Sequence, residues 1–358
     1  MVVDTAAYAA ITPLLPKLSD EYGLTKATAG ALSASYPVGT VVLALPAGAL
    51  ASRFGPRRTI LVALGVLAGS SLVFGLASSA PVLIAARTLQ GFGAAAVWAG
   101  GLAWVIAVAP RDRRAEAIGA AIGAAISGSL GGPILAALAD GLGRGVVFGA
   151  FVALPVALIV ALARLANPDN VPTLGSGALF RDRRARVGIL LMMLPSAVFG
   201  LVNVLIPLRL DELGAGAAAI AAVFLVAVVL EAGLSPVAGR LADSRGPLTP
   251  ARAGLVAGAV GLLLLPLPGH VLLLGVTVVF ACGVLGLMWA PAMSMLGDAA
   301  DRHHLNPAFA FSIGNLAWGM GTAIGGSGGG ALANVTTDAV PYLLLAAAAA
   351  VTAVTVRY

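Results

Sequence analysis

Long apolar runs alternate with short polar or turn-rich stretches along almost the whole chain. A helix that crosses a bilayer needs about 20 mostly apolar residues, because each residue rises about 1.5 Å and the hydrocarbon core is about 30 Å thick. The first run is shorter than this, so the pattern leaves open whether further residues precede it. The pattern predicts twelve membrane-spanning helices, over residues 1–16, 28–51, 58–78, 81–108, 115–140, 145–164, 187–208, 216–238, 252–268, 270–293, 306–333 and 340–356.

The composition supports this interpretation and excludes an ordinary soluble domain. Hydrophobic residues make up 59% of the 358 residues and charged residues 10%, with a mean hydropathy of +1.00. Soluble domains have about 45–50% apolar and about 25% charged residues. The one cysteine, Cys282, cannot form a disulfide within the chain, so it says nothing of the compartment. We therefore expect an all-α integral membrane protein.

The basic residues predict the orientation, because loops rich in Lys and Arg stay on the cytoplasmic side. With a cytoplasmic N-terminus, sixteen basic residues fall on the inner side and four on the outer side. We expect a multi-pass protein of the inner (plasma) membrane with both termini in the cytoplasm. This distribution accounts for the net charge of +6, so no nucleic-acid partner is needed to explain the charge. We expect the protein to be a monomer. The inner residues are Arg53, Arg57, Arg58, Arg111, Arg113, Arg114, Arg164, Arg181, Arg183, Arg184, Arg186, Arg240, Arg245, Arg252, Arg302 and Arg357, and the outer ones are Lys17, Lys26, Arg144 and Arg209.

A polar stretch and an internal repeat divide the chain into two halves. Residues 165–186 are predicted to form a cytoplasmic linker between a six-helix half at 1–164 and another at 187–358. Five residues of the loop at 48–58 recur 191 positions later, in the loop at 239–247. Parallel repeats of this kind build transporters whose binding site lies near the membrane midplane, between two pseudo-symmetric halves. The recurring residues are Gly48, Leu50, Ala51, Gly55 and Pro56.

The repeated loop resembles the signature between the second and third helices of the major facilitator superfamily. Ser52 stands where that signature usually has an acid, and Pro56 where its first basic residue is usual. The resemblance implies that the acid holds one conformation through a basic residue and a helix N-terminus on the other half. Asp243 keeps this acid in the second copy, whereas Ser52 carries no charge for such a latch. The alternative is a short cytoplasmic turn. The resemblance rests on Gly48, Ser52, Arg53, Gly55, Arg57, Arg58, Asp243 and Gly246.

Two further stretches resemble the same family. Arg87, Gln90 and Gly91 are similar to its fourth-helix motif. In the fifth run, four residues follow the spacing of the glycine pattern found in drug and proton antiporters, except that Ala136 stands in place of the final glycine. This resemblance implies an exporter. Glycines on one face let a neighbouring helix approach closely, and a proline permits a bend, although ordinary small-residue packing is the alternative. These four residues are Gly119, Gly128, Gly132 and Pro133.

Three ionisable residues lie within apolar runs, where a charge costs about 2.5–3.5 kcal/mol. Asp4 is the first candidate for proton coupling, because the resembled family often has an acid in this helix; alternatively it lies at the cytoplasmic surface. Arg87 is expected to hold or release a carboxylate, or else to extend to the outer face. Glu231 is a second proton site or binds a cationic substrate, unless it merely bonds Ser235 or a neighbouring helix.

The substrate-binding residues are predicted only from their type. Tyrosine, tryptophan and amide side chains within the runs suit amphipathic solutes, although packing or interfacial anchoring explains each of them as well. His303 and His304 are expected to lie in a solvated loop, so no metal site is predicted. The candidates are Tyr8, Tyr36, Gln90, Trp98, Asn203, Trp289, Asn315 and Trp318.

Together these features favour a secondary transporter that exports a small amphipathic or drug-like solute in exchange for protons. Its partners would be the substrate, protons and the lipid bilayer, and its energy source would be the proton gradient, without a cofactor. Proton-coupled uptake of a sugar or organic acid remains an alternative, as does a transport-dead membrane sensor. No nucleophile with a base and no phosphate-binding loop is visible, so we do not expect an enzyme.

Overall fold

The computed structural model describes residues 1–110, 114–166, 177–305 and 307–357. Throughout these ranges the secondary structure is helical and contains no strand. Seven of the helices so described are long and apolar enough to cross a membrane. The chain forms two compact units, Met1–Leu14 with Ser35–Leu174, and Leu15–Ala34 with Gly175–Tyr358. The boundaries of the two predicted halves stay a prediction.

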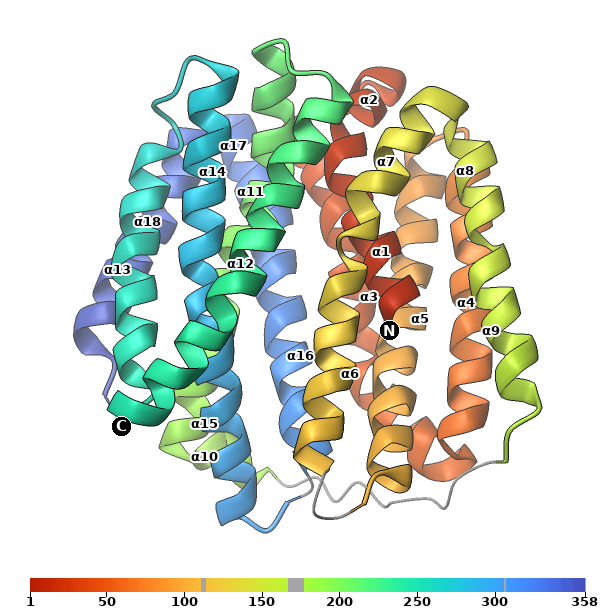
Figure 1. The fold of residues 1–358 in the computed structure, drawn as a ribbon. Coiled ribbons are helices and arrows are strands. Elements are labelled where there is room, and N and C mark those ends of the chain that lie inside the picture. The colour runs from red at the N-terminus through yellow and green to blue at the C-terminus, as the bar shows by residue number, and fades with distance from the viewer. Residues whose placement is uncertain (111–113, 167–176, 306, 358) are drawn as a thin grey trace. The chain divides into compact units, whose positions relative to one another are not determined.

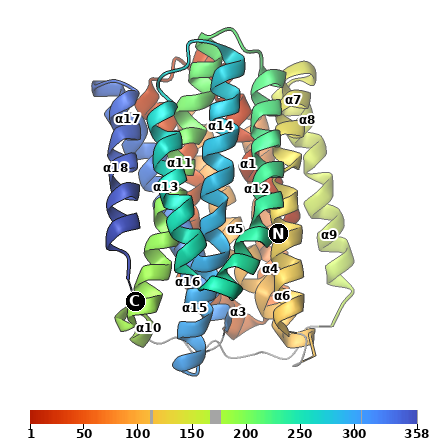
Figure 2. The ribbon, with the colours of Figure 1, turned by 60° about the vertical axis from the view of Figure 1, so that its left-hand side comes forward.

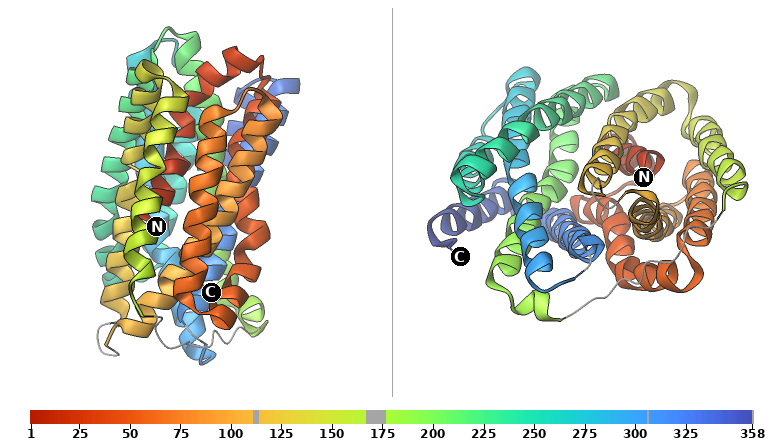
Figure 3. Two further views of the ribbon diagram at one scale, coloured as in Figure 1. Left: turned by 90° about the vertical axis from the view of Figure 1, so that its right-hand side faces the viewer. Right: turned by 60° about the horizontal axis from the view of Figure 1, so that its bottom comes forward.

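In the first unit, α1 packs against α5, α6 and α7, while α4 packs against α5, α8 and α9 (Figure 1). Phe74 of α4 and Phe148 of α8 meet edge to face, with ring centroids 4.9 Å apart. Figure 3 shows the yellow-green α9 beside the orange α4. From the N-terminus to the end of α9, the helices are α1 (Val2–Ala9), α2 (Ile11–Tyr22), α3 (Lys26–Phe54), α4 (Pro56–Leu76), α5 (Ala80–Val108), α6 (Arg114–Gly128), α7 (Gly131–Leu142), α8 (Arg144–Phe151) and α9 (Ala153–Ala163). Most of α2 and the start of α3 belong to the second unit.

In the second unit, the long helix α11 packs against α14, α15, α16 and α18, and α13 packs against α14 and α18 (Figure 2). A 3-10 turn separates α14 from α15, and a π-helical turn separates α16 from α17. The elements are α10 (Ala178–Arg181), α11 (Arg183–Glu212), α12 (Ala217–Arg245), α13 (Leu248–Leu264), α14 (Val271–Leu285), η2 (Gly286–Met288), α15 (Trp289–Arg302), α16 (Pro307–Ala323), η3 (Ile324–Gly328), α17 (Gly329–Val335) and α18 (Ala339–Thr355).

Among the described residues, helices cover most of each of the twelve predicted runs, but several boundaries differ. The helices α12 and α15 extend seven and nine residues past the predicted ends at 238 and 293, to Arg245 and Arg302. Likewise, α11 begins at Arg183, inside the predicted linker. Apolarity marks only the part of a helix that lies in hydrocarbon, and a helix with charged ends continues beyond it.

The first predicted run is broken at Ala10, which separates α1 from α2. Pro13 lies in the first turn of α2 and has no N–H to donate to the Ala9 carbonyl. Pro16 lies inside α2 and removes a second donor. The helix therefore bends here and leaves carbonyl groups at the end of α1 open to another donor.

Backbones approach closely where α11 meets the π-helical turn η3. A Cβ atom at Gly325 would lie 2.6 Å from the carbonyl carbon of Ala197, so only glycine fits there. From the other side, a Cβ at Gly200 would lie 2.8 Å from the backbone nitrogen of Gly326. These glycines thus bring the two elements into backbone contact.

Candidate functional site

Asp4 is buried in the first unit, with 1% of its surface exposed. The Tyr36 hydroxyl of α3 donates a hydrogen bond to its Oδ1, and the Trp98 Nε1 of α5 donates one to its Oδ2 at 3.0 Å. In the described part of the chain, no basic side chain bonds this carboxyl directly. The carboxyl is therefore held by two neutral donors, so it can gain or lose a proton without breaking an ion pair.

Arg87 is also buried, and it binds the open end of α1. Its Nη1 donates to the Ala7 carbonyl at 3.0 Å, and its Nη2 donates to the Tyr8 carbonyl at 3.2 Å. Both carbonyls lie in the last turn of α1, where a cation is favoured by the helix dipole. Arg87 therefore contacts backbone carbonyls, where the sequence led us to expect a carboxylate.

Aromatic and amide groups connect Arg87 with the surroundings of Asp4. The Arg87 Cζ lies 4.8 Å from the centroid of the Tyr36 ring, and the Tyr8 and Tyr36 rings lie 4.9 Å apart. The Nη1 of Arg87 also donates to Gln90 Oε1 at 2.9 Å, and the Gln90 amide donates to Ser71. The Nε of Arg87 has no partner among the described residues, so one buried donor remains for another acceptor. The predicted Tyr8, Tyr36, Gln90 and Trp98 thus belong to the surroundings of Asp4 and Arg87.

Two of the predicted fifth-helix glycines lie against the helix that carries Asp4. A Cβ at Gly132 would lie 2.6 Å from the carbonyl carbon of Ala9, and one at Gly128 would lie 2.8 Å from the Cα of Val2. Thr5 reinforces this contact by donating to the Ala125 carbonyl at 2.5 Å. Pro133, which follows directly, is buried in α7. The surroundings of Gly119 lie outside what the structure describes.

Glu231 lies in the second unit, on α12, and is half-buried. The Trp289 Nε1 of α15 donates to its Oε1 at 2.6 Å. Gly286 makes room for this side chain, because a Cβ there would lie 2.5 Å from the Cγ of Glu231. Trp289 stacks on Phe199, with centroids 5.8 Å apart and an interplanar angle of 29°. The partner expected from the sequence, Ser235, has its side chain outside the described residues.

The remaining predicted binding residues lie elsewhere on the second unit. Asn203 is half-buried on α11, and Asn315 and Trp318 are half-buried on α16. No group of three or more His, Cys, Asp or Glu side chains that could hold a metal ion occurs within the described ranges.

The two copies of the repeated loop have the same backbone conformation. Gly55 has φ +86° and ψ 154°, and Gly246 has φ +83° and ψ 155°. A side chain is strained at such a φ, which explains why both copies keep glycine. Pro56 begins α4, where a helix tolerates proline because its first N–H groups have no partner. The side chain of Asp243 lies outside the described part of the second copy.

Comparisons with known proteins identify the family. A sequence model of the Major Facilitator Superfamily matches residues 1–306 and again residues 188–358. The chain belongs to the Major Facilitator Superfamily. This confirms the resemblance seen in the repeated loop, and it means that the protein is a membrane transporter by family. A solved structure of a bacterial homolog of the human lysosomal transporter Spinster, in an inward-facing and occupied conformation, shares the fold with a TM-score of 0.80. That match covers 99% of this chain and 92% of the other, at 14% sequence identity.

Curated relatives in the superfamily match only part of their own length. The uncharacterized MFS-type transporter Rv1250 of Mycobacterium tuberculosis is 37% identical over 29% of this chain and 18% of the relative. A probable 4-methylmuconolactone transporter of Cupriavidus pinatubonensis is 38% identical over 30% of this chain and 25% of the relative. The multidrug resistance protein Stp of Mycobacterium tuberculosis is 42% identical over 24% of this chain and 16% of the relative. The chain therefore spans a quarter or less of each of these proteins.

Two arginines that the sequence assigned mainly to topology also bind helix ends. Arg57, at the start of α4, donates from Nε to the Leu162 carbonyl at 3.0 Å and from Nη2 to the Ala163 carbonyl, both at the end of α9. Arg252, near the start of α13, donates from Nη2 to the Val356 carbonyl at 2.7 Å, at the end of α18. An arginine bound to carbonyls at a helix end thus occurs in both units. Arg53 and Arg58 are exposed.

Removing either of these arginines should destabilise the protein. We expect Arg57→Gln and Arg252→Gln each to reduce stability by about 1–2 kcal/mol, since a cation at a helix C-terminus is lost. Thermal unfolding of the purified protein measures this as a lower melting temperature. Arg58→Gln is the matched control, because Arg58 is exposed and adjacent to Arg57. An equal loss in the Arg58 variant would show that the general basic charge matters and the helix ends do not.

Asp182 fixes the start of α11 on the predicted cytoplasmic side. Its carboxylate accepts hydrogen bonds from the backbone N–H groups of Arg184 and Ala185, and it pairs with Arg302 at 3.1 Å and His303 at 3.2 Å. Partial burial raises the pKa of Asp182, but the bonds from Ala185, Arg302 and Arg184 outweigh it and hold the pKa below the ordinary value of 3.8. His303 thus belongs to a capped helix start, a role that its loop position did not indicate.

This lowered pKa predicts a pH-dependent effect. Asp182→Ala should reduce stability by about 1 kcal/mol at neutral pH, because α11 loses its N-cap. The contribution is present above the ordinary carboxyl pKa and is lost as the pH falls through the lower folded-state pKa. The difference in melting temperature between wild type and variant should therefore shrink at about pH 3. Asp301→Ala, at an exposed acid nearby, is the control, and an unchanged difference at low pH would contradict the prediction.

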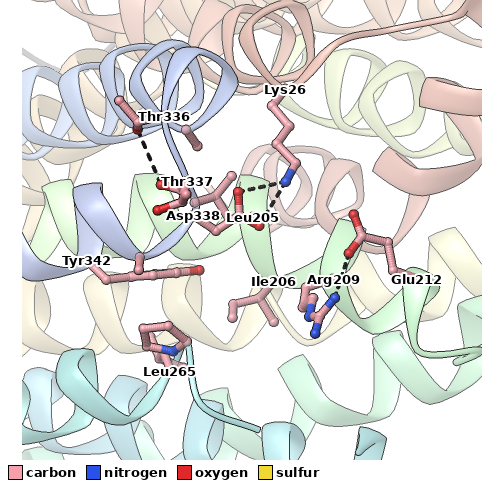
Figure 4. Close-up of a pocket in the computed structure, with 13 residues that line it drawn as sticks. Lys26, Leu205, Ile206, Arg209, Glu212, Leu265, Thr336, Thr337, Asp338 and Tyr342 are labelled. Atoms are coloured by element: carbon pink, nitrogen blue, oxygen red, sulfur yellow. Dashed lines mark hydrogen bonds and ion pairs between the residues drawn. The ribbon is translucent and has the colours of Figure 1, made fainter. Parts of the chain in front are cut away.

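A cavity of about 370 Å³ lies in the second unit, between the end of α11 and the start of α18 (Figure 4). The Lys26 Nζ reaches the Asp338 carboxylate at 2.6 Å, and Arg209 pairs with Glu212 at 2.9 Å. Leu205 and Ile206 supply apolar lining. None of the binding residues predicted from the sequence lines this cavity.

Proposed function

We propose that this superfamily member is a proton-coupled exporter of small amphipathic, drug-like solutes that works by alternating access. The observation that carries the proposal is the Asp4 carboxyl, fully buried in an apolar helix and held by the neutral donors Tyr36 and Trp98. An ionisable group costs energy in the membrane interior, so its retention indicates a function. The antiporter-like glycine pattern and the multidrug resistance relative Stp support export.

The two donors assign different roles to the carboxyl oxygens. The Trp98 N–H can only donate, and a protonated Oδ2 accepts a hydrogen bond less well than a carboxylate oxygen, so a proton on Oδ2 would weaken that bond. The Tyr36 hydroxyl can donate or accept, so Oδ1 can carry the proton while Tyr36 reverses its role. Proton uptake at Oδ1 would therefore change the hydrogen bonds between α1 and α3. In the proposal, this change favours one access state, and substrate binding favours release of the proton.

Arg87 adjusts this equilibrium without bonding Asp4 in the structure. Its positive charge lies against the Tyr36 ring and fixes the end of α1. Its unpartnered Nε is available to a carboxylate or to a substrate in another state. The proposal includes the inner (plasma) membrane as location, both termini in the cytoplasm, a monomer as the working unit, and the proton gradient as the energy source.

The test is proton movement induced by substrates. Inverted membrane vesicles with an acidic interior receive a panel of amphipathic compounds, each followed with a pH-sensitive dye and by its accumulation. We expect at least one compound to accumulate while the interior becomes less acidic, and vesicles without the protein to show neither. Accumulation that persists after the pH gradient is collapsed would contradict proton coupling. Binding without flux would instead favour a transport-dead sensor.

The 4-methylmuconolactone transporter relative favours a second candidate, the proton-coupled uptake of a small organic acid or its lactone. The same residues would serve, since Asp4 can couple a proton to movement in either direction. Right-side-out vesicles distinguish the two candidates. Uptake predicts that an inward proton gradient drives the organic acid into the vesicles, whereas export predicts that it drives amphipathic compounds out.

A further inference from the structure

Glu231 lies beside two aromatic rings that come from different helices of the second unit. It stands on α12, Trp289 begins α15, and Phe199 lies on α11. The Trp289 N–H binds Oε1 of the carboxylate at 2.6 Å, and its ring stacks on Phe199 with centroids 5.8 Å apart. A carboxylate and a stacked aromatic pair thus lie together within an apolar part of the chain.

This arrangement leaves hydrogen-bonding capacity unused. Within the described ranges, the bond from Trp289 is the sole hydrogen bond of the Glu231 side chain, and no basic side chain pairs with it. A carboxylate has two oxygens and room for about four hydrogen bonds, so the described residues fill only part of its capacity. The side chains of Glu231, Trp289 and Phe199 are all half-buried rather than sealed in the core. A ligand can therefore reach both the charge and the rings.

Local backbone features hold the carboxylate in this place. The α14 helix stops at Leu285, and the 3-10 turn that follows begins with Gly286, which lies directly against the Glu231 side chain. Any larger residue at 286 would meet Glu231. The turn also starts α15 at Trp289, which directs the indole N–H to the carboxylate. A purely structural acid would be expected to fill its hydrogen-bonding capacity with nearby donors.

We propose that Glu231, Trp289 and Phe199 form a binding site for a hydrophobic organic cation with a single positive charge. The carboxylate supplies the counter-charge, and the aromatic rings bind the apolar body of the ligand and its delocalised charge. An anion is repelled by Glu231, and a neutral solute gains at most a hydrogen bond from it, without the attraction between opposite charges. The inference rests on the proposed export of amphipathic solutes and narrows the class of exported solutes to cations. In this proposal the substrate binds at Glu231, whereas the coupling proton binds at Asp4.

The experiment measures binding of tetraphenylphosphonium, a hydrophobic cation that carries no titratable proton, to the purified full chain. Wild type should bind it, whereas tetraphenylborate, an anion of the same shape, should not compete for the site. Glu231→Gln should weaken binding about tenfold or more, because the counter-charge is lost while the side-chain size is kept. Glu212→Gln is the matched control, since it removes an exposed acid of the same unit. Unchanged affinity in the Glu231 variant overturns the proposal.

Two further measurements apply even where Glu231→Gln does not fold. Glu231→Asp should retain cation binding, and Trp289→Leu should weaken it about fivefold or more, because the ring and its N–H are lost. In the wild type, a hydrophobic carbodiimide should modify Glu231, as seen by peptide mass spectrometry. Tetraphenylphosphonium should slow this reaction and tetraphenylborate should not. Equal rates of Glu231 modification with and without tetraphenylphosphonium would also overturn the proposal.

These outcomes are separate from those that test export. Loss of cation binding on Glu231→Gln, in a protein that moves no protons, supports the site and contradicts the proposed function. Proton-coupled transport of neutral or anionic compounds, with no cation binding at Glu231, supports the function and contradicts the site.

Discussion

An Asp4→Asn variant should lose the proton movement that substrates induce in inverted vesicles, down to the leak rate of vesicles without the protein. Asparagine keeps the size of the side chain, and its carbonyl oxygen can still accept the Trp98 N–H bond. It cannot take up or release a proton in the physiological range. The variant should therefore fold and bind substrate while coupling fails.

The measurement that separates coupling from folding is substrate exchange at equal pH. Counterflow of a labelled substrate needs no net proton movement, so Asp4→Asn should retain a substantial part of it. Asp140→Asn, which changes an exposed acid on α7 in the same unit, is the matched control and should couple normally. Wild-type proton release from the Asp4 variant would remove Asp4 from the mechanism. Tyr36→Phe should give an intermediate loss, since the carboxyl keeps Trp98 but loses its reversible partner.

A Gly132→Ala variant should unfold at a lower temperature than the wild type. The added methyl group would lie 2.6 Å from the carbonyl carbon of Ala9 and 2.8 Å from the nitrogen of Ala10, so α1 must move away from α7. Overpacking of this kind costs about 1–3 kcal/mol. Because α1 carries Asp4 and its end is bound by Arg87, the displacement should also slow transport.

Gly123 provides the control, because a Cβ atom there would meet nothing within 4 Å. Gly123→Ala should leave stability unchanged or raise it by up to about 1 kcal/mol, since alanine favours the helix. Thermal unfolding of the three purified proteins, followed by their transport rates, tests the prediction. Similar melting temperatures for Gly132→Ala and the wild type would show that α1 and α7 do not pack as closely as described.

The helices could be predicted from the sequence because most of the apolar runs have about the length that a bilayer demands. Their ends could not, since α12 continues to Arg245 and α15 to Arg302 through stretches in which charged residues interrupt the apolar ones. The break between α1 and α2 did have a signal, in Pro13 and Pro16, whose missing N–H groups interrupt the helix just after the Ala7 and Tyr8 carbonyls that Arg87 binds. Residue types alone favoured a carboxylate partner for Arg87, because a buried guanidinium usually meets an acid.

The candidate site was predictable in its members but not in its contacts. Asp4, Tyr36 and Trp98 could each be selected as polar or aromatic residues within apolar runs. Their contacts join positions 32 and 94 residues apart, and such pairings depend on how the helices pack. The repeated loop could be recognised because the backbone itself requires glycine at Gly55 and Gly246. The binding of Arg57 and Arg252 to helix ends could not be predicted, because these two arginines are 195 positions apart and therefore do not follow the 191-residue period of the loop.

The helix-end arginines also bear on the order in which each half of the protein is completed during synthesis. Arg57 joins partners 105 residues further along the chain, and Arg252 joins one 104 residues further along. Each arginine therefore leaves the ribosome long before the carbonyls that it binds. Until α9 or α18 is inserted, the guanidinium remains at the membrane surface and can bind lipid phosphate groups. Insertion of α9 or α18 then replaces such a lipid contact by carbonyls at the helix end, so nascent chains that stop short of residue 162 or residue 356 should be recognisable by an arginine still in contact with lipid.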